Sequence, residues 1–205
     1  MILKTYPLGD LQTNCYVLID ETTNDAVAID IGANASFLMM EELKHGFTIK
    51  AVLLTHAHFD HINGVYKFYE RGAEVYIGAG DEPGVTDSSL NLSKFFGDET
   101  HPFKIKTALQ GGEMLKFGEI EVEVISTQGH TKGGVSYKIN DKIFCGDVLF
   151  KGSFGRVDFP GGNVKELCAS SKKLLEYNAI LYPGHGEPTT TDEERGTNPI
   201  TYYYD

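Results

Sequence analysis

The 205-residue sequence contains few cysteines and no long apolar segment. Its three cysteines, Cys15, Cys145 and Cys168, are widely spaced and form no Cys-x-x-Cys pair, so we expect buried, reduced thiols in a cytoplasmic protein. No run approaches the roughly 18 apolar residues that a membrane span requires, so no membrane partner is expected. The first ten residues, MILKTYPLGD, lack the apolar core of a signal peptide. This fits the cytoplasm, although a mature secreted chain would look the same.

Basic residues are also scarce. Lysine and arginine together number 18, against 29 aspartates and glutamates, which gives a formal charge of −11 at pH 7. An acidic surface repels phosphate backbones, so a nucleic-acid partner is disfavoured. The hydrophobic content of 41% and the charged content of 23% are ordinary for a soluble globular protein.

Strand-like and helix-like segments are interleaved along the chain, with more strands than a simple βαβ series contains. Strands are expected at 15–19, 26–31, 49–54, 74–77, 120–125, 135–139, 142–145 and 179–182, and helices at 35–45, 61–71 and 163–176. Asn140 and Asp141 predict a tight hairpin turn, and the polar segment 80–101 predicts a long loop. This order favours an α+β fold in which two sheets carry helices on their outer sides, within one domain.

Histidine is concentrated in one short motif. Three of the seven histidines lie in the sequence THAHFDH, residues 55–61. His56 and His58 follow a predicted strand two residues apart, so their imidazoles can face the same side and meet one ion. Asp60 and His61 follow where the chain turns into a predicted helix, which can direct them to a second position nearby.

Three further candidates each follow a predicted strand and have a glycine neighbour. They are His130, Asp147 and His185. Glycine lets the backbone turn sharply, and strand ends of a sheet face a common rim, so these side chains can converge. A lone histidine after a strand is usually a surface or capping residue, but a cluster of this size is typical of a metal site.

The ligand types predict the kind of metal. Imidazole and carboxylate groups without thiolate suit zinc, iron or manganese. Seven ligands are too many for one tetrahedral ion and suit two ions that share a bridging carboxylate. A two-metal site lowers the pKa of a bridging water and polarises the substrate's oxygen, which indicates hydrolysis.

These residues resemble the metallo-β-lactamase superfamily. THAHFDH matches its H-x-H-x-D-H signature, and the three distal candidates follow in the family's order, so the resemblance covers nearly the whole chain. It implies a four-layer αβ/βα sandwich with the site at one edge of the two sheets. Within the superfamily, GHTKGGVSY (129–137) and GDVLFKGSFGRVDFPGGN (146–163) resemble the small, single-domain bacterial glyoxalase II-like hydroxyacylglutathione hydrolases.

The resemblance implies a role for each ligand. A first ion would be held by His56, His58 and His130, and a second by Asp60, His61 and His185, with Asp147 as the bridge. A metal-bridging hydroxide would attack the carbonyl of a small-molecule thioester, and Asp60 and Asp147 are the predicted catalytic residues. Two divalent ions are expected as cofactors, with zinc first and iron or manganese as alternatives.

The sequence departs from typical glyoxalase II chains in two places. The chain ends soon after His185, so we expect a single domain over residues 1–205 without the helical C-terminal extension that binds glutathione in those enzymes. The thiol carrier is then glutathione or another low-molecular-weight thiol. In the segment that reads GHTPGH in the family, Lys132 and Gly134 replace a proline and a histidine. Lys132 either reaches an anionic substrate or is a solvated loop lysine.

The glycine-rich segment 151–162 follows Asp147 directly and is expected to line the cleft. Phe154 and Phe159 are candidates to cover an acyl or thiol group. Arg156 either holds a substrate carboxylate or pairs with Asp158 to shape the loop.

Residues beside the ligands are expected to orient them. Asp30, after the second predicted strand, is a candidate to accept a hydrogen bond from the free N–H of a ligand histidine. Thr55 and Thr131, each beside a ligand, are expected to orient ligands or cap the backbone rather than to react.

An iron-dependent persulfide dioxygenase on the same scaffold is the alternative reading, because the GRVDF segment resembles those enzymes. Such enzymes hold one iron with two histidines and one carboxylate, whereas the full second ligand set here favours two metals and hydrolysis. A β-lactamase is disfavoured because those with two zincs usually lack a carboxylate at position 147. A nuclease is disfavoured by the charge of −11.

Overall fold

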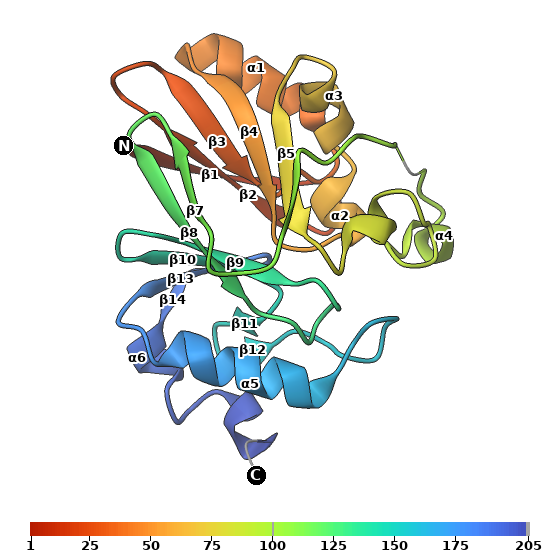
Figure 1. Ribbon diagram of the computed structural model, residues 1–205, viewed down its shortest axis with the longest axis vertical. Helices are drawn as coiled ribbons and strands as arrows, with labels where there is room; N and C mark the ends of the chain where they lie inside the picture. Colours follow the sequence, from red (N-terminus) through yellow and green to blue (C-terminus); the bar gives the residue numbers. More distant parts are fainter. Residues whose placement is uncertain (100, 204–205) are drawn as a thin grey trace.

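Two six-stranded sheets pack face to face in the computed structural model, which describes residues 1–99 and 101–203 (Figure 1). The first sheet has the order β1-β2-β3-β4-β5-β6, in which β1 to β3 are antiparallel neighbours and β3 to β6 are parallel. Its strands are β1 (Ile2–Leu8), β2 (Thr13–Ile19), β3 (Asp25–Ile29), β4 (Thr48–Leu54), β5 (Glu74–Gly78) and β6 (Thr107–Leu109).

The second sheet has the order β14-β13-β10-β9-β8-β7 and is antiparallel except for the parallel pair β10 and β13. Its strands are β7 (Met114–Phe117), β8 (Ile120–Ser126), β9 (Val135–Ile139), β10 (Lys142–Gly146), β13 (Ile180–Pro183) and β14 (Thr189–Thr190). A small separate hairpin, β11 (Leu149–Phe150) with β12 (Ser153–Phe154), follows β10.

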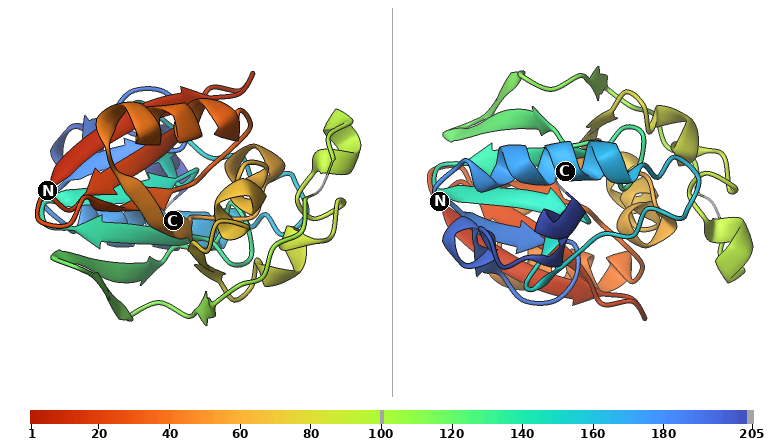
Figure 2. Two further views of the ribbon diagram at one scale, coloured as in Figure 1. Left: turned by 90° about the horizontal axis from the view of Figure 1, so that it is seen from above. Right: turned by 90° about the horizontal axis from the view of Figure 1, so that it is seen from below.

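Helices cover the outer faces of both sheets (Figures 1 and 2). On the first sheet these are α1 (Ala35–His45) and α3 (Val65–Tyr69), and on the second α5 (Val164–Leu175). The shorter helices are α2 (Phe59–Ile62), η1 (Glu82–Val85), α4 (Ser93–Phe96), α6 (Thr191–Glu194) and η2 (Pro199–Tyr203). The layers confirm the predicted αβ/βα sandwich. Within the described ranges, no helix combines the length and the apolar character that a membrane crossing needs.

Alternating strand residues build three apolar layers between the four structural layers. Along β4, Val52 packs toward the helices on the first sheet, whereas Leu53 packs between the sheets. Along β10, Phe144 packs between the sheets, whereas Cys145 packs with the residues of α5. Successive strand residues point to opposite faces, so these strands are apolar on both sides. The three cysteines are buried and form no disulfide, as predicted.

Two segments differ from the sequence expectation. The helix expected at 61–71 is two short helices, α2 and α3, because the Gly64 N–H donates to the Ile31 carbonyl (2.9 Å) instead of continuing the helix. The segment 80–101, expected as a long loop, contains η1 and α4. Each of these is four residues long, too short for a helical period to show in the sequence.

The strands that precede the candidate ligands lead to one rim. β8 and β10 are both antiparallel to β9, and β13 is parallel to β10, so the C-terminal ends of β8, β10 and β13 share one edge of the second sheet. His130, Asp147 and His185 follow these three ends. The end of β4 in the first sheet brings residues 55–61 to the same place.

Candidate metal centre

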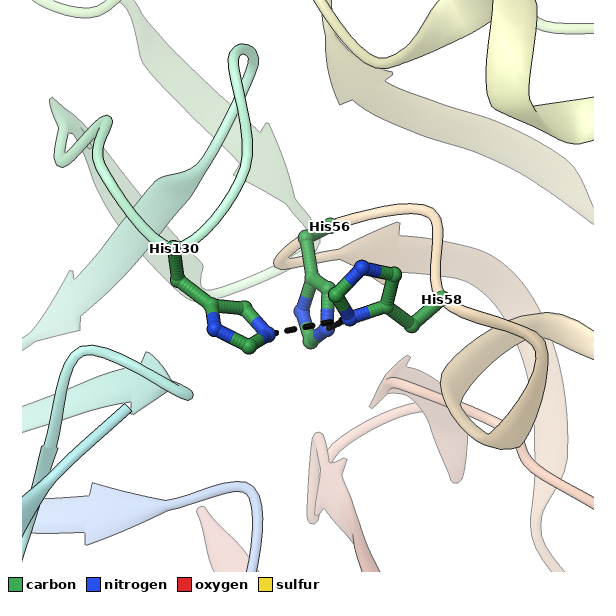
Figure 3. A group of neighbouring side chains, drawn as sticks. All are labelled: His56, His58 and His130. Carbon is green, nitrogen blue, oxygen red and sulfur yellow. Dashed lines mark hydrogen bonds between the residues drawn. The ribbon is translucent and has the colours of Figure 1, made fainter. Parts of the chain in front are cut away.

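The structure brings all seven predicted ligands together. We call His56, His58 and His130 the three-histidine group, which Figure 3 shows with the rings directed toward one another. We call Asp60, His61 and His185 the carboxylate group. A third set, His56, His61 and Asp147, overlaps the first two. Within each set the candidate donor atoms lie within 4.8 Å of one another.

The three-histidine group is buried and compact. His58 Nδ1 lies 3.0 Å from His56 Nε2 and 2.9 Å from His130 Nε2. All three side chains are buried. Three nitrogen atoms therefore face one small volume from which bulk water is largely excluded.

The carboxylate group is more open and contains an acid. Asp60 Oδ2 lies 3.2 Å from His185 Nε2 and 3.5 Å from His61 Nε2. Thr13 Oγ1 donates a 2.7 Å hydrogen bond to the same oxygen. The His185 side chain is 29% exposed, whereas that of His61 is fully buried. One side of this group is therefore accessible from solvent.

Asp147 lies between the two groups. Its Oδ2 is 3.6 Å from His130 Nε2 and 3.7 Å from His185 Nε2, and its Oδ1 is 3.5 Å from His61 Nε2. The neighbouring Gly184 permits this approach, because a Cβ there would lie 2.2 Å from Asp147 Oδ1. The Asp147 carboxylate therefore lies near ligand nitrogens of both groups.

Hydrogen bonds on the far side of each ring assign the imidazole tautomers. The Nδ1–H groups of four histidines have oxygen partners: Thr55 Oγ1 for His56, Asp30 Oδ2 for His61, the Arg156 carbonyl for His130 and the Leu11 carbonyl for His185. In the neutral form of each of these four rings, the Nε2 atom is therefore unprotonated and faces the centre. His58 is the reverse, since its Nδ1 faces the other histidines.

The two groups differ in electrostatics. Burial, and then the neighbouring imidazoles, lower the pKa of His56 well below its usual value and that of His58 to about 2. In the carboxylate group, burial opposes the charged form of His61, but Asp60, Asp30 and Asp147 outweigh it and raise its pKa to about 10. Burial also opposes ionisation of Asp60, but His61, His185 and Thr13 hold its pKa below the usual range.

The donor set fits divalent metal ions. His58 Nε2, His61 Nε2 and Asp147 Oδ1 are buried and have no hydrogen-bond partner among residues 1–99 and 101–203. Burying unpaired polar atoms is costly, and cations that bind the inward-facing atoms His61 Nε2 and Asp147 Oδ1 would remove that cost. Imidazole nitrogen and carboxylate oxygen without thiolate match zinc, iron or manganese.

Two of the three predicted supporting residues, Asp30 and Thr55, contact the ligands, whereas Thr131 contacts Asp81. Asp30 is buried and accepts hydrogen bonds from His61 Nδ1 (2.9 Å), Thr55 Oγ1 (2.7 Å) and Thr55 N (2.8 Å). Thr55 Oγ1 in turn accepts from His56 Nδ1 at 3.0 Å. Thr131 donates its hydroxyl hydrogen bond to Asp81. Asp30 and Thr55 therefore fix ring orientations in both groups.

The three predicted residues of the segment 151–162 make different contacts. Arg156 pairs with Asp158 through two 2.6 Å contacts and lies 3.9 Å from the ring centre of Phe159, so the loop-shaping alternative describes its contacts. The Phe159 ring lies 6.0 Å from that of His58. Phe154 instead packs against Tyr203 at 5.9 Å, near α5 and away from the ligands.

A sizeable cavity lies beside each group. The larger, about 660 Å³, is bordered by Asp60 and by the acids Asp10 and Asp98. The smaller, about 290 Å³, is bordered by His58 and Lys132. In the part of the chain that the structure describes, no lysine or arginine lines the larger cavity, and Lys132 is the one that lines the smaller.

Two residues that contact a ligand or the ligand loops were not predicted from the sequence. Thr13, in the first hairpin, binds Asp60. Asp81 is buried and accepts hydrogen bonds from Ala57, Thr131 and Gly133, all beside ligands. An aspartate directly after a strand and next to glycine was a usable signal for Asp81, but it fell in the segment expected to be loop.

The fold and this cluster define a protein of the metallo-β-lactamase superfamily. Residues 8–185 match the metallo-beta-lactamase superfamily, and the chain belongs to that family.

Curated relatives cover nearly the whole chain. It is 34% identical over 204 residues to the probable metallo-hydrolase YqgX of Bacillus subtilis, with 96% of each chain covered. It is 32% identical over 210 residues to the hydroxyacylglutathione hydrolase GloC of Haemophilus influenzae, with 98% of each chain covered.

Solved structures also match this chain over nearly its whole length. The B3 metallo-beta-lactamase BLEG-1 superposes with a TM-score of 0.91 at 35% identity, covering 97% of this chain and 99% of that one. TTHA1623, crystallised in a di-iron-bound form, gives a TM-score of 0.85 at 34% identity, with 98% and 100% covered. ETHE1 from Myxococcus xanthus gives 0.80 at 27% identity, with 97% and 84% covered.

Proposed function

We propose that the protein is a dinuclear metal-dependent hydrolase that cleaves a small-molecule thioester, in the manner of a hydroxyacylglutathione hydrolase. The observation that carries the proposal is the convergence of two three-ligand groups on the shared carboxylate of Asp147. The similarity to GloC along nearly the whole chain supports the substrate class. Zinc is the expected metal, with iron or manganese as alternatives.

The three-histidine group would hold one ion and the carboxylate group the other, with Asp147 between them. Such ions would supply acidity to a shared water and polarise the carbonyl oxygen of the substrate. Asp60, kept ionised by its neighbours, would serve as the anionic ligand of the second ion at the open side of the centre. A thiol has a pKa of about 8.5, so the leaving thiolate needs no strong acid to protonate it.

Each of the two cavities can accept a different part of the substrate. The 290 Å³ cavity carries Lys132 and can accept an anionic part of the substrate, whereas the 660 Å³ cavity beside Asp60 can accept an uncharged part. Phe159 lies beside His58, where it limits access of water from that side.

The experiment loads metal-free protein with zinc, iron or manganese and follows thioester loss with lactoylglutathione and other low-molecular-weight thioesters. The Asp147→Asn variant is the control for contaminating hydrolase. Turnover that needs metal and is lost in the variant is the expected result. No thioester turnover with any of the three metals would contradict the proposal.

A second candidate is an iron-dependent persulfide dioxygenase. His56, His61 and Asp147 form a two-histidine, one-carboxylate set within 4.8 Å, the kind that holds a single non-haem iron. Oxygen uptake with a persulfide tests it on the same metal-loaded samples. Because the similar structure BLEG-1 is a B3 metallo-beta-lactamase, hydrolysis of a chromogenic β-lactam belongs in the same screen.

A further inference from the structure

Asp81 connects the loops that supply the three-histidine group. It lies three residues after the end of β5, and its side chain is buried. Its Oδ2 accepts hydrogen bonds from the Ala57 N–H (3.0 Å) and the Thr131 hydroxyl (2.7 Å), and its Oδ1 accepts from the Gly133 N–H (2.6 Å).

All three donors lie beside candidate ligands. Ala57 stands between His56 and His58 in the segment after β4 of the first sheet. Thr131 follows His130 in the loop between β8 and β9 of the second sheet. The carboxylate of Asp81 therefore joins ligand loops that come from different sheets.

The loops also touch along their backbones at this point. A Cβ on Gly133 would lie 2.1 Å from the Asp81 nitrogen, so the segment after β5 packs directly on the loop after His130. Asp81 differs from Asp30, which binds the His61 imidazole itself. Among the described residues, Asp81 is hydrogen-bonded to the backbone of the ligand loops and to the Thr131 hydroxyl, but not to an imidazole.

We propose that Asp81 is a positioning residue that fixes the separation of the two ligand loops, and that it thereby sets the affinity of the three-histidine group for its ion. His56 and His58 must stay within about 3 Å of His130 for one ion to meet all three nitrogens. The carboxylate group has no hydrogen bond to Asp81 and is unaffected. This inference rests on the metal-binding part of the proposed function and not on the thioester substrate.

The Asp81→Asn variant keeps the size of the side chain and breaks the hydrogen bonding. An asparagine has one acceptor oxygen, so its NH₂ group would face either the Gly133 N–H or the Ala57 N–H, which are both donors. Asp20→Asn is the matched control. Asp20 is also buried and accepts from Thr22 N (2.8 Å) and Glu119 N (2.9 Å), but it follows β2 at the opposite end of the first sheet from His56.

The experiment measures zinc affinity of metal-free protein by competition with a chromophoric chelator in two backgrounds. His185→Ala leaves the three-histidine group intact, and His130→Ala leaves Asp60 and His61 with His185. In the His185→Ala background, Asp81→Asn should weaken zinc binding about 10- to 100-fold, as removal of a ligand-supporting contact does. In the His130→Ala background the change should be within about twofold on the same reasoning. Asp20→Asn should change neither affinity.

Stability is read separately from circular dichroism and thermal unfolding of each metal-free variant. If Asp81→Asn does not fold, Thr131→Val removes one of the three hydrogen bonds and should give a smaller loss in the same background. Unchanged zinc affinity in the His185→Ala background, with the fold intact, would overturn the proposal. Equal weakening in both backgrounds would also overturn it. Loss of thioester turnover in Asp81→Asn with normal zinc affinities would contradict the inference about Asp81 and leave the proposed function standing. Selective loss of zinc affinity in the variant, with no thioester activity in the unmodified protein, would support the inference about Asp81 and contradict the thioester proposal.

Discussion

The two halves of the metal centre are built from different chemistry. The three-histidine group contains only buried imidazoles, and the surrounding rings and burial keep His56 and His58 neutral. The carboxylate group surrounds the buried ring of His61 with three acids and is partly open at His185. A neutral imidazole is ready to bind a metal, whereas a protonated one must first lose a proton.

The difference shows how one scaffold can prepare two ion sites separately. One half contains neutral imidazoles, and Asp81 contacts its two loops from outside. The other half contains an acid and is contacted by Thr13 and by Asp30, which also reaches His56 through Thr55. Asp147 is the contact between them. Variants that act on one half, on both, or on neither therefore test the comparison.

Replacing Asp147 should have the largest effect because its oxygens approach ligands of both halves. We expect Asp147→Asn to lower kcat for a thioester by at least about 10²-fold, the loss typical of removing a group that stabilises the transition state. Metal content per chain should also fall. Steady-state kinetics with elemental analysis measures both, and near wild-type turnover in this variant would show that the halves do not act together.

Removing one ligand from each half should lower the metal content asymmetrically. His58→Ala should lower turnover strongly, though no more than Asp147→Asn does, with the fold retained, and should leave about one ion per chain, held by the carboxylate group. His185→Ala should leave about one ion in the three-histidine group. Elemental analysis with circular dichroism checks both variants. Two ions retained in either would mean that the removed side chain is not a ligand.

Asp30 should matter next, because it orients His61 directly and His56 through Thr55. Asn tolerates the positive φ of 54° at this position, so Asp30→Asn should fold. The zinc affinity of the carboxylate group should fall about 10- to 100-fold, measured by chelator competition. An unchanged zinc affinity would show that Asp30 does not support metal binding by the carboxylate group.

Raising the pH should strengthen metal binding by the carboxylate group about tenfold per pH unit relative to binding by the three-histidine group. Because the pKa of His61 is raised to about 10, its Nε2 is protonated in the metal-free protein at pH 7 to 8 and must release that proton to an incoming ion. Affinity of the carboxylate group should therefore rise with pH in this range, while His56 and His58 release no proton. Calorimetry in buffers of different ionisation enthalpy, on the His130→Ala and His185→Ala backgrounds, counts the protons. Equal release from both would contradict the comparison.

The smallest effect is expected from Lys132, an exposed lysine at the rim of the 290 Å³ cavity. Lys132→Ala should raise KM for an anionic thioester by up to about fivefold, the range of an exposed ion pair, and should leave kcat unchanged. A neutral thioester serves as the control substrate. An equal rise in KM for both would show that Lys132 does not recognise charge.

Much of the centre was predictable from the sequence because its ligands follow strands. The spacing of His56 and His58 on an extended segment, and glycine beside His130, Asp147 and His185, are local features. The helix at 35–45 and the Asn163 cap of α5 were predicted for the same reason, and both agree with the structure.

Features set by tertiary contacts could not be predicted in this way. The break between α2 and α3 follows from a hydrogen bond to Ile31, which lies far back in the sequence. The edge strands β1, β6, β7 and β14 were not predicted, since short or partly exposed strands lack a continuous apolar run. Phe154 lies near the ligands in the sequence, but the β11–β12 hairpin turns it toward Tyr203.

The measurement that tests the central claim most directly is a titration of metal-free protein with zinc in which bound metal and thioester turnover are recorded on the same samples. The account predicts about two ions per chain at saturation, with turnover appearing as the second ion binds. Full turnover with a single ion, or saturation at one iron accompanied by oxygen uptake with a persulfide, would contradict it.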